Sequence, residues 1–150
     1  MEFVQKNKKR KIEVYKGDGF YLKKFFKRNE QWLETHVENL QNAYPNYLLD
    51  YGAESDHVWT KVKQLPGKEA WQFEQTEEFI KKIVEFCKAN YKKTYPYAHT
   101  DWGLSNILID GDNIYLCDWD GVAIYPKQWT MQTMYATLVK DMGIRVKKYF

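Results

Sequence analysis

The chain has 150 residues, 44% of them hydrophobic, which is enough for one domain with a buried core and excludes wholesale disorder. No apolar run is long enough to span a bilayer, and the first residues lack the apolar stretch of a signal peptide. The two cysteines, Cys87 and Cys117, exclude a disulfide framework and a zinc knuckle. We therefore expect a cytoplasmic protein with free, buried thiols.

The net charge of +3 conceals an uneven distribution along the chain. Lysines and arginines crowd residues 6–28, whereas aspartates gather between Asp101 and Asp120. A basic first segment facing an acidic cluster suits a site for metal and polyphosphate. The alternative is that both are ordinary solvated faces.

The first segment predicts antiparallel strands. Two runs at 11–15 and 20–26 flank Gly17-Asp18-Gly19, whose glycines tolerate the positive φ of a tight hairpin. A shorter strand around Phe3-Val4 precedes them, and the basic segment 5–10 joins it to the next strand.

The middle of the chain predicts a helix and two more strands. The helix runs from about Asn29, a good N-cap, to Asn42. Its apolar positions fall on one face: Leu33, Val37 and Leu40. Strands at 47–51 and 57–62 follow, and they end at 64–67, where Pro and Gly stop strand pairing.

The second half predicts a helix, a hairpin and a last helix. The helix at 76–90 carries an apolar stripe at helical spacing. The stripe consists of Phe79, Ile80, Ile83, Val84 and Cys87. Two short strands within 107–117 turn at 110–113, and the last helix runs from about 128 to 142, closed by Gly143.

The most specific motif lies around this hairpin. His99, Asp101 and Asn106 form the pattern H-x-D-x-x-x-x-N, and Asp118-Trp119-Asp120 follows the hairpin. A carboxylate, a carboxamide and a second carboxylate at these spacings can converge on one magnesium–phosphate site, because a hard cation prefers oxygen ligands. The alternative is a β-hairpin with incidental polar residues.

This motif resembles the catalytic half of the protein-kinase-like superfamily. It is most similar to the small-molecule branch that includes aminoglycoside phosphotransferases and choline kinases, with Asp118-Trp119-Asp120 in place of Asp-Phe-Gly. The resemblance implies an α+β, two-lobe fold. We expect a small antiparallel-sheet N-lobe over residues 1–63, a hinge at 64–67 and a truncated, mainly helical C-lobe over 68–150.

The resemblance also implies a role for each motif residue. Asp101 corresponds to the catalytic Asp, which orients the acceptor hydroxyl and takes its proton. Asn106 and Asp118 correspond to the Mg²⁺ ligands. His99 supports the loop by hydrogen bonding, and Asp120 is an auxiliary group at the metal site.

The N-terminal segment adds weaker matches. Phe20-Tyr21-Leu22-Lys23 resembles V-A-I-K of the third kinase strand, which makes Lys23 the first choice for gripping the ATP phosphates. Lys24 is the second choice, on the opposite face of the strand. Backbone groups around Lys63 and Leu65 resemble the hinge that hydrogen-bonds adenine.

The resemblance further implies a glutamate partner for Lys23 on the following helix. Glu34 is the predicted partner, because Tyr44-Pro45-Asn46 then follows where the family has an H-P-N turn. Glu30 and Glu38 stay open as alternatives, since they lie near the same helix face.

Two features depart from the family. No glycine lies between the first two predicted strands, at 5–10, so either side-chain cations replace backbone amides as phosphate ligands or the triphosphate is held loosely. In a rival alignment Gly17-Asp18-Gly19 is the phosphate loop and 20–26 the second strand, which demotes Lys23. Few residues follow Asp120, so the acceptor site would be open, completed by a second copy in a homodimer, or absent. Four aromatic residues are candidates for an acceptor surface or for the core: Trp102, Trp119, Tyr125 and Trp129.

We weigh three functions. The first is an ATP- and Mg²⁺-dependent kinase that phosphorylates a hydroxyl of a small molecule or saccharide. The second is a pseudokinase, a nucleotide-binding module that regulates a partner. The third is a basic nucleic-acid-binding protein that uses residues 6–11.

Overall fold

A computed structural model describes residues 1–150. The chain divides into two compact units, Met1–Gln64 and Leu65–Phe150, and each is described by itself. None of the helices combines the length and the apolar composition needed to cross a bilayer.

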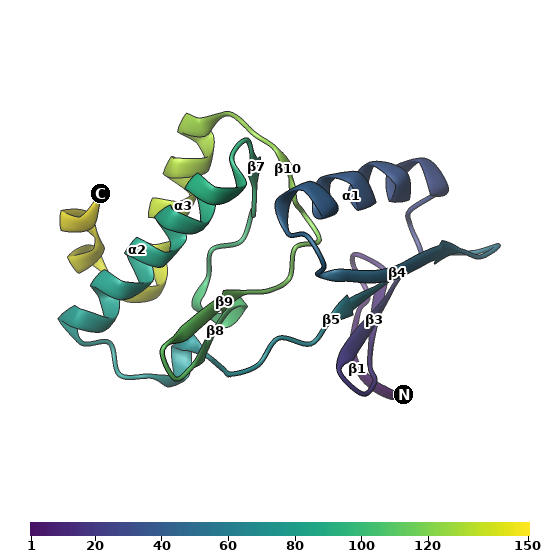
Figure 1. Ribbon diagram of the computed structural model, residues 1–150, viewed down its shortest axis with the longest axis horizontal. Coiled ribbons are helices and arrows are strands. Elements are labelled where there is room, and N and C mark those ends of the chain that lie inside the picture. The colour runs from purple at the N-terminus through teal and green to yellow at the C-terminus, as the bar shows by residue number, and fades with distance from the viewer. The chain divides into compact units, whose positions relative to one another are not determined.

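The first unit is a five-stranded antiparallel sheet with one helix (Figure 1). The strand order is β1-β2-β3-β5-β4, and the helix α1, Glu30–Ala43, connects β3 to β4. The strands are β1 Glu2–Asn7, β2 Ile12–Lys16, β3 Phe20–Phe25, β4 Leu48–Ala53 and β5 Val58–Lys63.

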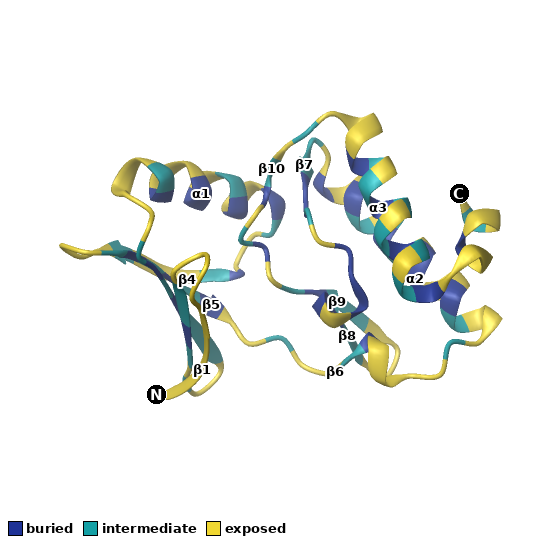
Figure 2. Ribbon diagram, turned by 180° about the vertical axis from the view of Figure 1, so that it is seen from behind, coloured by how far each residue is buried: buried dark blue, intermediate teal, exposed yellow.

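The helix α1 forms as the sequence predicts. The side chain of Asn29 accepts a hydrogen bond from the backbone N–H of Trp32 at 2.9 Å, which satisfies a donor at the helix start. The predicted apolar face is buried, and Figure 2 shows it turned toward the sheet. Phe25, Leu33, Val37 and Val58 form the core cluster between sheet and helix.

The strands at the N-terminus differ from the prediction in one respect. The strand β1 is longer than Phe3-Val4 and takes in part of the basic segment, so the turn before β2 is only 8–11. The glycine-rich hairpin at 17–19 joins β2 to β3. Phe20–Phe25 is therefore the third strand, and the alignment that makes it the second strand is wrong.

The second unit contains two long helices and two small sheets. The helices α2, Glu77–Thr94, and α3, Lys127–Met142, lie side by side in both views (Figures 1 and 2). One sheet has the order β6-β8-β9, and the other pairs β7 with β10. The strands are β6 Lys68–Glu69, β7 Tyr97–Ala98, β8 Ile107–Asp110, β9 Asn113–Leu116 and β10 Ala123–Ile124. Three 3-10 helices complete the unit: η1 Ala70–Gln72, η2 Leu104–Asn106 and η3 Ile144–Tyr149.

The predicted boundaries of α2 are right at the start and short at the end. Thr76 caps α2 by accepting a hydrogen bond from the Phe79 N–H at 3.1 Å. The helix continues past Asn90 because Tyr91 and Thr94 extend its buried stripe. The last helix and the hairpin are confirmed, whereas the two-residue strands β6, β7 and β10 were not predicted, since such short strands carry no periodicity.

The core of the second unit is rich in aromatic rings. Trp102 and Trp119 are buried, so they are core residues, whereas Trp129 is 41% exposed and stacks on Tyr125. Both cysteines are free thiols, and burial raises the pKa of Cys87. The predicted α+β class, with a small antiparallel sheet followed by a reduced helical unit, is confirmed.

Candidate active site

Within the second unit, His99 forms hydrogen bonds to both parts of the motif, the loop at 99–106 and the segment at 117–120. Its Nδ1 accepts a hydrogen bond from the Asp101 N–H at 2.9 Å, so its Nε2 must carry the proton. That Nε2 lies 2.7 Å from the carbonyl oxygen of Cys117, to which it donates. His99 is only 1% exposed and packs edge-on against Trp119. The neutral imidazole therefore links the Asp101 loop to the residue before Asp118.

Asp101 presents an exposed carboxylate from a buried loop. Its Oδ1 accepts a hydrogen bond from the Gly103 N–H at 3.2 Å, while Trp102 between them is fully buried. A Cβ on Gly103 would lie 3.2 Å from this oxygen. Glycine at this position therefore lets the backbone approach the carboxylate closely.

Asn106 is oriented by the same loop. It is buried at the end of η2, and its Nδ2 donates to the carbonyl oxygen of Asp101 at 3.3 Å. The side-chain oxygen thus keeps its acceptor role. The Asn106 carbonyl accepts from the Cys117 N–H at 2.8 Å, so Asn106 lies beside the segment that leads into Asp118.

Asp118 is exposed and has a left-handed backbone, with φ of 60°. Such a conformation costs a non-glycine residue about 1–3 kcal/mol and is held only by its surroundings. Here Trp119 supplies that restraint, because its ring is buried and its Nε1 donates to the Leu116 carbonyl at 2.7 Å. Asp120 follows, half-buried.

The loop after Asp118 also lies directly against the loop that carries Asp101. A Cβ on Gly121 would lie 2.4 Å from Thr100 Oγ1, closer than any side chain tolerates. The predicted groups Asp101, Asn106 and Asp118 are thus brought onto one cluster of loops by contacts at 99–101 and 117–121.

The donor set of this cluster fits Mg²⁺. Two exposed carboxylates and an oriented carboxamide oxygen are hard ligands, and Mg²⁺ binds proteins through one or two carboxylates while keeping water and phosphate ligands. No group of three or more His, Cys, Asp or Glu side chains in the chain is arranged to hold a metal. The imidazole in this cluster, His99, has both ring nitrogens in hydrogen bonds, so it does not offer a softer ligand to a metal.

Asp141 on α3 anchors the loop at 99–106, and sequence reasoning missed it. Its Oδ2 accepts from the Leu104 N–H at 2.8 Å and would lie 3.3 Å from a Cβ on Gly103. Its own carbonyl accepts from Gln75 Nε2 at 3.3 Å. An acidic residue in the last turn of a helix opposes the helix dipole, which is the one signal in the sequence that pointed to a use for it.

In the first unit, Lys23 lies on the buried face of β3. It is 8% exposed and pairs with Val14 on β2 and Thr60 on β5. Alternation places it on the same face as Phe25, which contacts α1. Lys24 lies on the opposite face, with its Nζ 5.0 Å from the ring centroid of Tyr15.

Lys23 affects the pKa of His36 on α1, a residue that sequence reasoning missed. Burial, together with the smaller effects of the Lys23 and Arg28 charges, lowers the pKa of His36 to about 4. His36 stacks on Trp32 at 4.7 Å between ring centroids. Glu34, two residues earlier, is exposed and borders a depression together with Val37 of α1 and Tyr51 of β4.

The segment predicted to bind adenine covers the last residues of the first unit and the first residue of the second. The Lys63 N–H donates to the Tyr47 carbonyl at 2.9 Å, and its side chain is exposed. The Gln64 N–H donates to the Gly19 carbonyl at 3.1 Å. Leu65, half-buried, is the first residue of the second unit.

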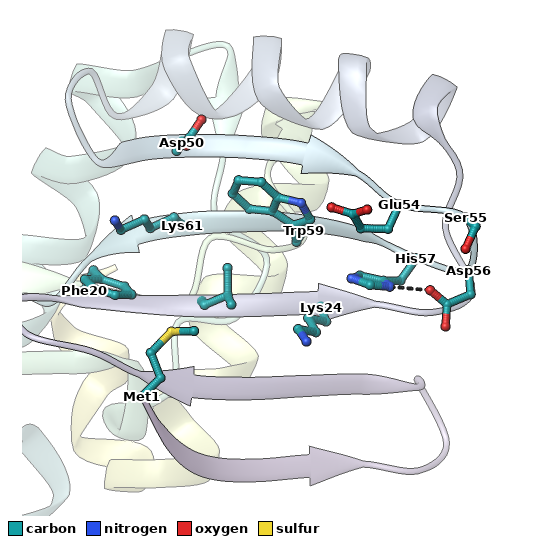
Figure 3. Close-up of a pocket in the computed structure, with 11 residues that line it drawn as sticks. Met1, Phe20, Lys24, Asp50, Glu54, Ser55, Asp56, His57, Trp59 and Lys61 are labelled. Carbon is teal, nitrogen blue, oxygen red and sulfur yellow. Dashed lines mark hydrogen bonds and ion pairs between the residues drawn. The ribbon is translucent and has the colours of Figure 1, made fainter.

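A shallow depression of about 650 Å³ covers the outer face of the first sheet (Figure 3). Trp59 and Phe20 lie at its floor, and the β4–β5 turn supplies the His57–Asp56 pair, 2.6 Å apart. The hydrogen bond from His57 lowers the pKa of Asp56. The lining includes Lys24 and none of the motif residues, so this depression is not the candidate active site.

Comparison with known proteins identifies the fold. No protein family and no curated protein matches the sequence. Solved structures do match. A structure of the bifunctional kinase-methyltransferase WbdD has a TM-score of 0.64 at 16% identity, over 88% of this chain and 35% of that one. A second WbdD structure has a TM-score of 0.63 at 17% identity, over 93% and 38%.

A viral protein extends the likeness. The kinase PK-1 of Cydia pomonella granulovirus has a TM-score of 0.54 at 19% identity, over 82% of this chain and 52% of that one. The chain spans between about a third and a half of the length of these kinases. At these identities the likeness concerns the fold alone: the chain has a kinase-like fold.

Proposed function

We propose that this chain transfers the γ-phosphoryl group of ATP to a hydroxyl of a small molecule or saccharide, in the presence of Mg²⁺. The observation that carries the proposal is the exposed Asp101 carboxylate, held by the Gly103 N–H in the same hydrogen-bond network as Asn106. Kinase-like neighbours support the reaction class.

Each residue has a stated role. Asp101 orients the acceptor hydroxyl and takes its proton while the new O–P bond forms and the bond to the ADP oxygen breaks. Asn106 and Asp118 would hold Mg²⁺, which neutralises phosphate charge when bound. His99 keeps the two loops together, and Asp120 supports the metal side.

The nucleotide would engage the remaining residues. Lys23 would pair with the phosphates, and backbone groups of Lys63 and Leu65 would hydrogen-bond adenine across a hinge at 64–67. Glu34, exposed on α1, would be the partner of Lys23, with Glu30 and Glu38 as the alternatives on the same helix.

The test is turnover by the purified chain with a panel of monosaccharides and amino alcohols, measured as ADP release. We expect Asp101→Asn to lower turnover about a thousandfold, because the base that accepts the hydroxyl proton is gone. Ser105→Ala, an exposed change in the same loop, is the matched control and should leave turnover unchanged. Equal rates in the wild type and Asp101→Asn would contradict the proposed role of Asp101.

A second candidate is a nucleotide-binding regulatory module without turnover. It is favoured by the turn 8–11, Lys8-Lys9-Arg10-Lys11, which offers no glycine to cover phosphates. Thermal shifts with ATP and Mg²⁺, ATP and EDTA, and no ligand separate the two functions. The site is supported if stabilisation needs both ATP and metal. This stabilisation should be lost in Asp118→Asn and kept in the exposed control Asp112→Asn. Such binding without ADP release on any acceptor would favour the second function.

A further inference from the structure

The second unit contains a cavity that the proposed reaction does not use. It has a volume of about 640 Å³ and lies where the last turns of α2 meet the first turns of α3. None of the residues at 99–106 or 117–120 lines it. The lining residues are Lys88, Ala89, Tyr91, Lys92, Tyr95, Lys127 and Met131.

The charge around this cavity has one sign. Lys88, Lys92 and Lys127 line it, and no acidic side chain does. Lys88 and Lys92 lie on one face of α2, because residues four apart are neighbours on a helix. Lys127 is the first residue of α3, which has no side-chain cap on its N–H groups, so the positive end of the helix dipole adds to the lysines.

Part of the lining is apolar. Ala89, Tyr95 and Met131 belong to it, and Tyr95 is 59% exposed. Lys88 is less available to a ligand, because its Nζ already donates a hydrogen bond to the Tyr149 carbonyl at 2.9 Å. Lys92 and Lys127 are exposed.

One buried hydroxyl among the lining residues has no hydrogen-bond partner. Tyr91 lines the cavity and is only 3% exposed, and its hydroxyl is unpaired. A buried polar group without a partner destabilises the fold, so a ligand oxygen that reached the Tyr91 hydroxyl would be stabilising.

From these observations we propose that the α2–α3 cavity binds an organic anion with an apolar body and one carboxylate or phosphate head group. The lysines disfavour a cationic ligand. The apolar part of the lining favours a ligand with a hydrocarbon body over an inorganic ion. The volume falls in the usual range for small-molecule sites. This assignment does not rest on the proposed phosphotransferase function.

The experiment is calorimetric titration of the full chain with dodecanoate, below its micelle concentration. Dodecanol, which lacks the charge, and inorganic phosphate, which lacks the apolar body, are the comparison ligands. We expect dodecanoate to bind at least about tenfold more tightly than either, because both parts of the ligand contribute.

Variants locate the site. Lys92→Glu and Lys127→Glu should each weaken dodecanoate binding about tenfold or more. Lys93→Glu is the matched control: Lys93 is also exposed, adjacent in sequence and outside the lining, so it should change little. Tyr91→Phe should weaken binding while leaving the unliganded protein as stable or more stable, since it removes an unpaired buried hydroxyl.

A last experiment distinguishes two possible ligands with this chemistry, a free organic anion and an anionic lipid headgroup. Vesicles of phosphatidylcholine and phosphatidylserine replace dodecanoate. Vesicle binding that depends on Lys92 but not on Lys93 supports a lipid headgroup as the source, and tight dodecanoate binding with weak vesicle binding supports a free anion. Equal losses in Lys92→Glu and Lys93→Glu, equal binding of dodecanol and dodecanoate, or unchanged affinity in Tyr91→Phe would each overturn the proposal.

Discussion

The two units differ in how far apart in sequence the neighbours of their candidate functional residues lie. In the second unit, His99, Asp101 and Asn106 lie within a few residues of one another and are joined by hydrogen bonds to each other and to Cys117. In the first unit, the surroundings of Lys23 come from β2, β5 and α1, which are distant in sequence. A local motif specifies its own geometry, whereas a residue whose neighbours are distant depends on the whole unit.

The largest effect on stability in this comparison should come from His36. An unfolded imidazole has a pKa of 6.5, whereas burial and then Lys23 and Arg28 lower the folded pKa to about 4. The neutral form is thus favoured in the folded state, so this stability is present above pH 6.5 and is lost as the pH falls toward 4. The loss should reach about 3 kcal/mol.

Urea unfolding across this pH range measures that loss. His36→Phe keeps a ring to stack on Trp32 and cannot titrate, so its free energy of unfolding should fall less between pH 6.5 and 4 than that of the wild type. Parallel pH profiles for the two proteins would show that the imidazole is not held neutral.

Replacing Asp141 tests whether the loop at 99–106 depends on its contact with α3 or is held in place by its own hydrogen bonds. Asp141→Ala leaves the Leu104 N–H without its charged acceptor and should cost about 1.5–3 kcal/mol in the free energy of unfolding. Turnover should fall as well, since the loop that carries Asp101 loses its attachment to α3. Asp112→Ala, in the exposed hairpin turn, is the control. If both variants unfold like the wild type, α3 does not position the loop.

The contact between Gly121 and Thr100 tests the link between the two loops of the site. Gly121→Ala would bring a methyl group 2.4 Å from Thr100 Oγ1 and should cost about 1–3 kcal/mol. Thr100→Ala removes the colliding oxygen, so the double variant should be more stable than Gly121→Ala alone. Denaturation midpoints of the four proteins in this cycle measure the coupling. Additive effects would mean that the loops are not in contact.

The same contrast explains what the sequence could and could not predict. The caps at Asn29 and Thr76, the hairpin and the loop motif were predictable because each depends on residues close in sequence. The end of α2 was set too early, because Tyr91 and Thr94 are buried by tertiary packing.

Partners from distant segments were harder to predict. Glu34 was chosen from its distance to a turn and stays a prediction, whereas His36, whose ring contacts Phe25 of the distant strand β3, was missed. Asp141 lies far along the chain from Leu104, so no local spacing could connect them. Non-local pairs such as these are specified by the packed fold rather than by a pattern.

The smallest effects should come from the helix caps, and they compare the two units most directly. Asn29→Ala removes the acceptor for the Trp32 N–H in the first unit, and Thr76→Ala removes the acceptor for the Phe79 N–H in the second. Each should cost about 1 kcal/mol, while Asn29→Asp and Thr76→Ser keep an acceptor and serve as controls. If the units unfold cooperatively, both alanine variants will lower one shared thermal transition. Two transitions, each lowered by only one of the variants, would instead show that the Lys23 unit and the Asp101 unit fold independently.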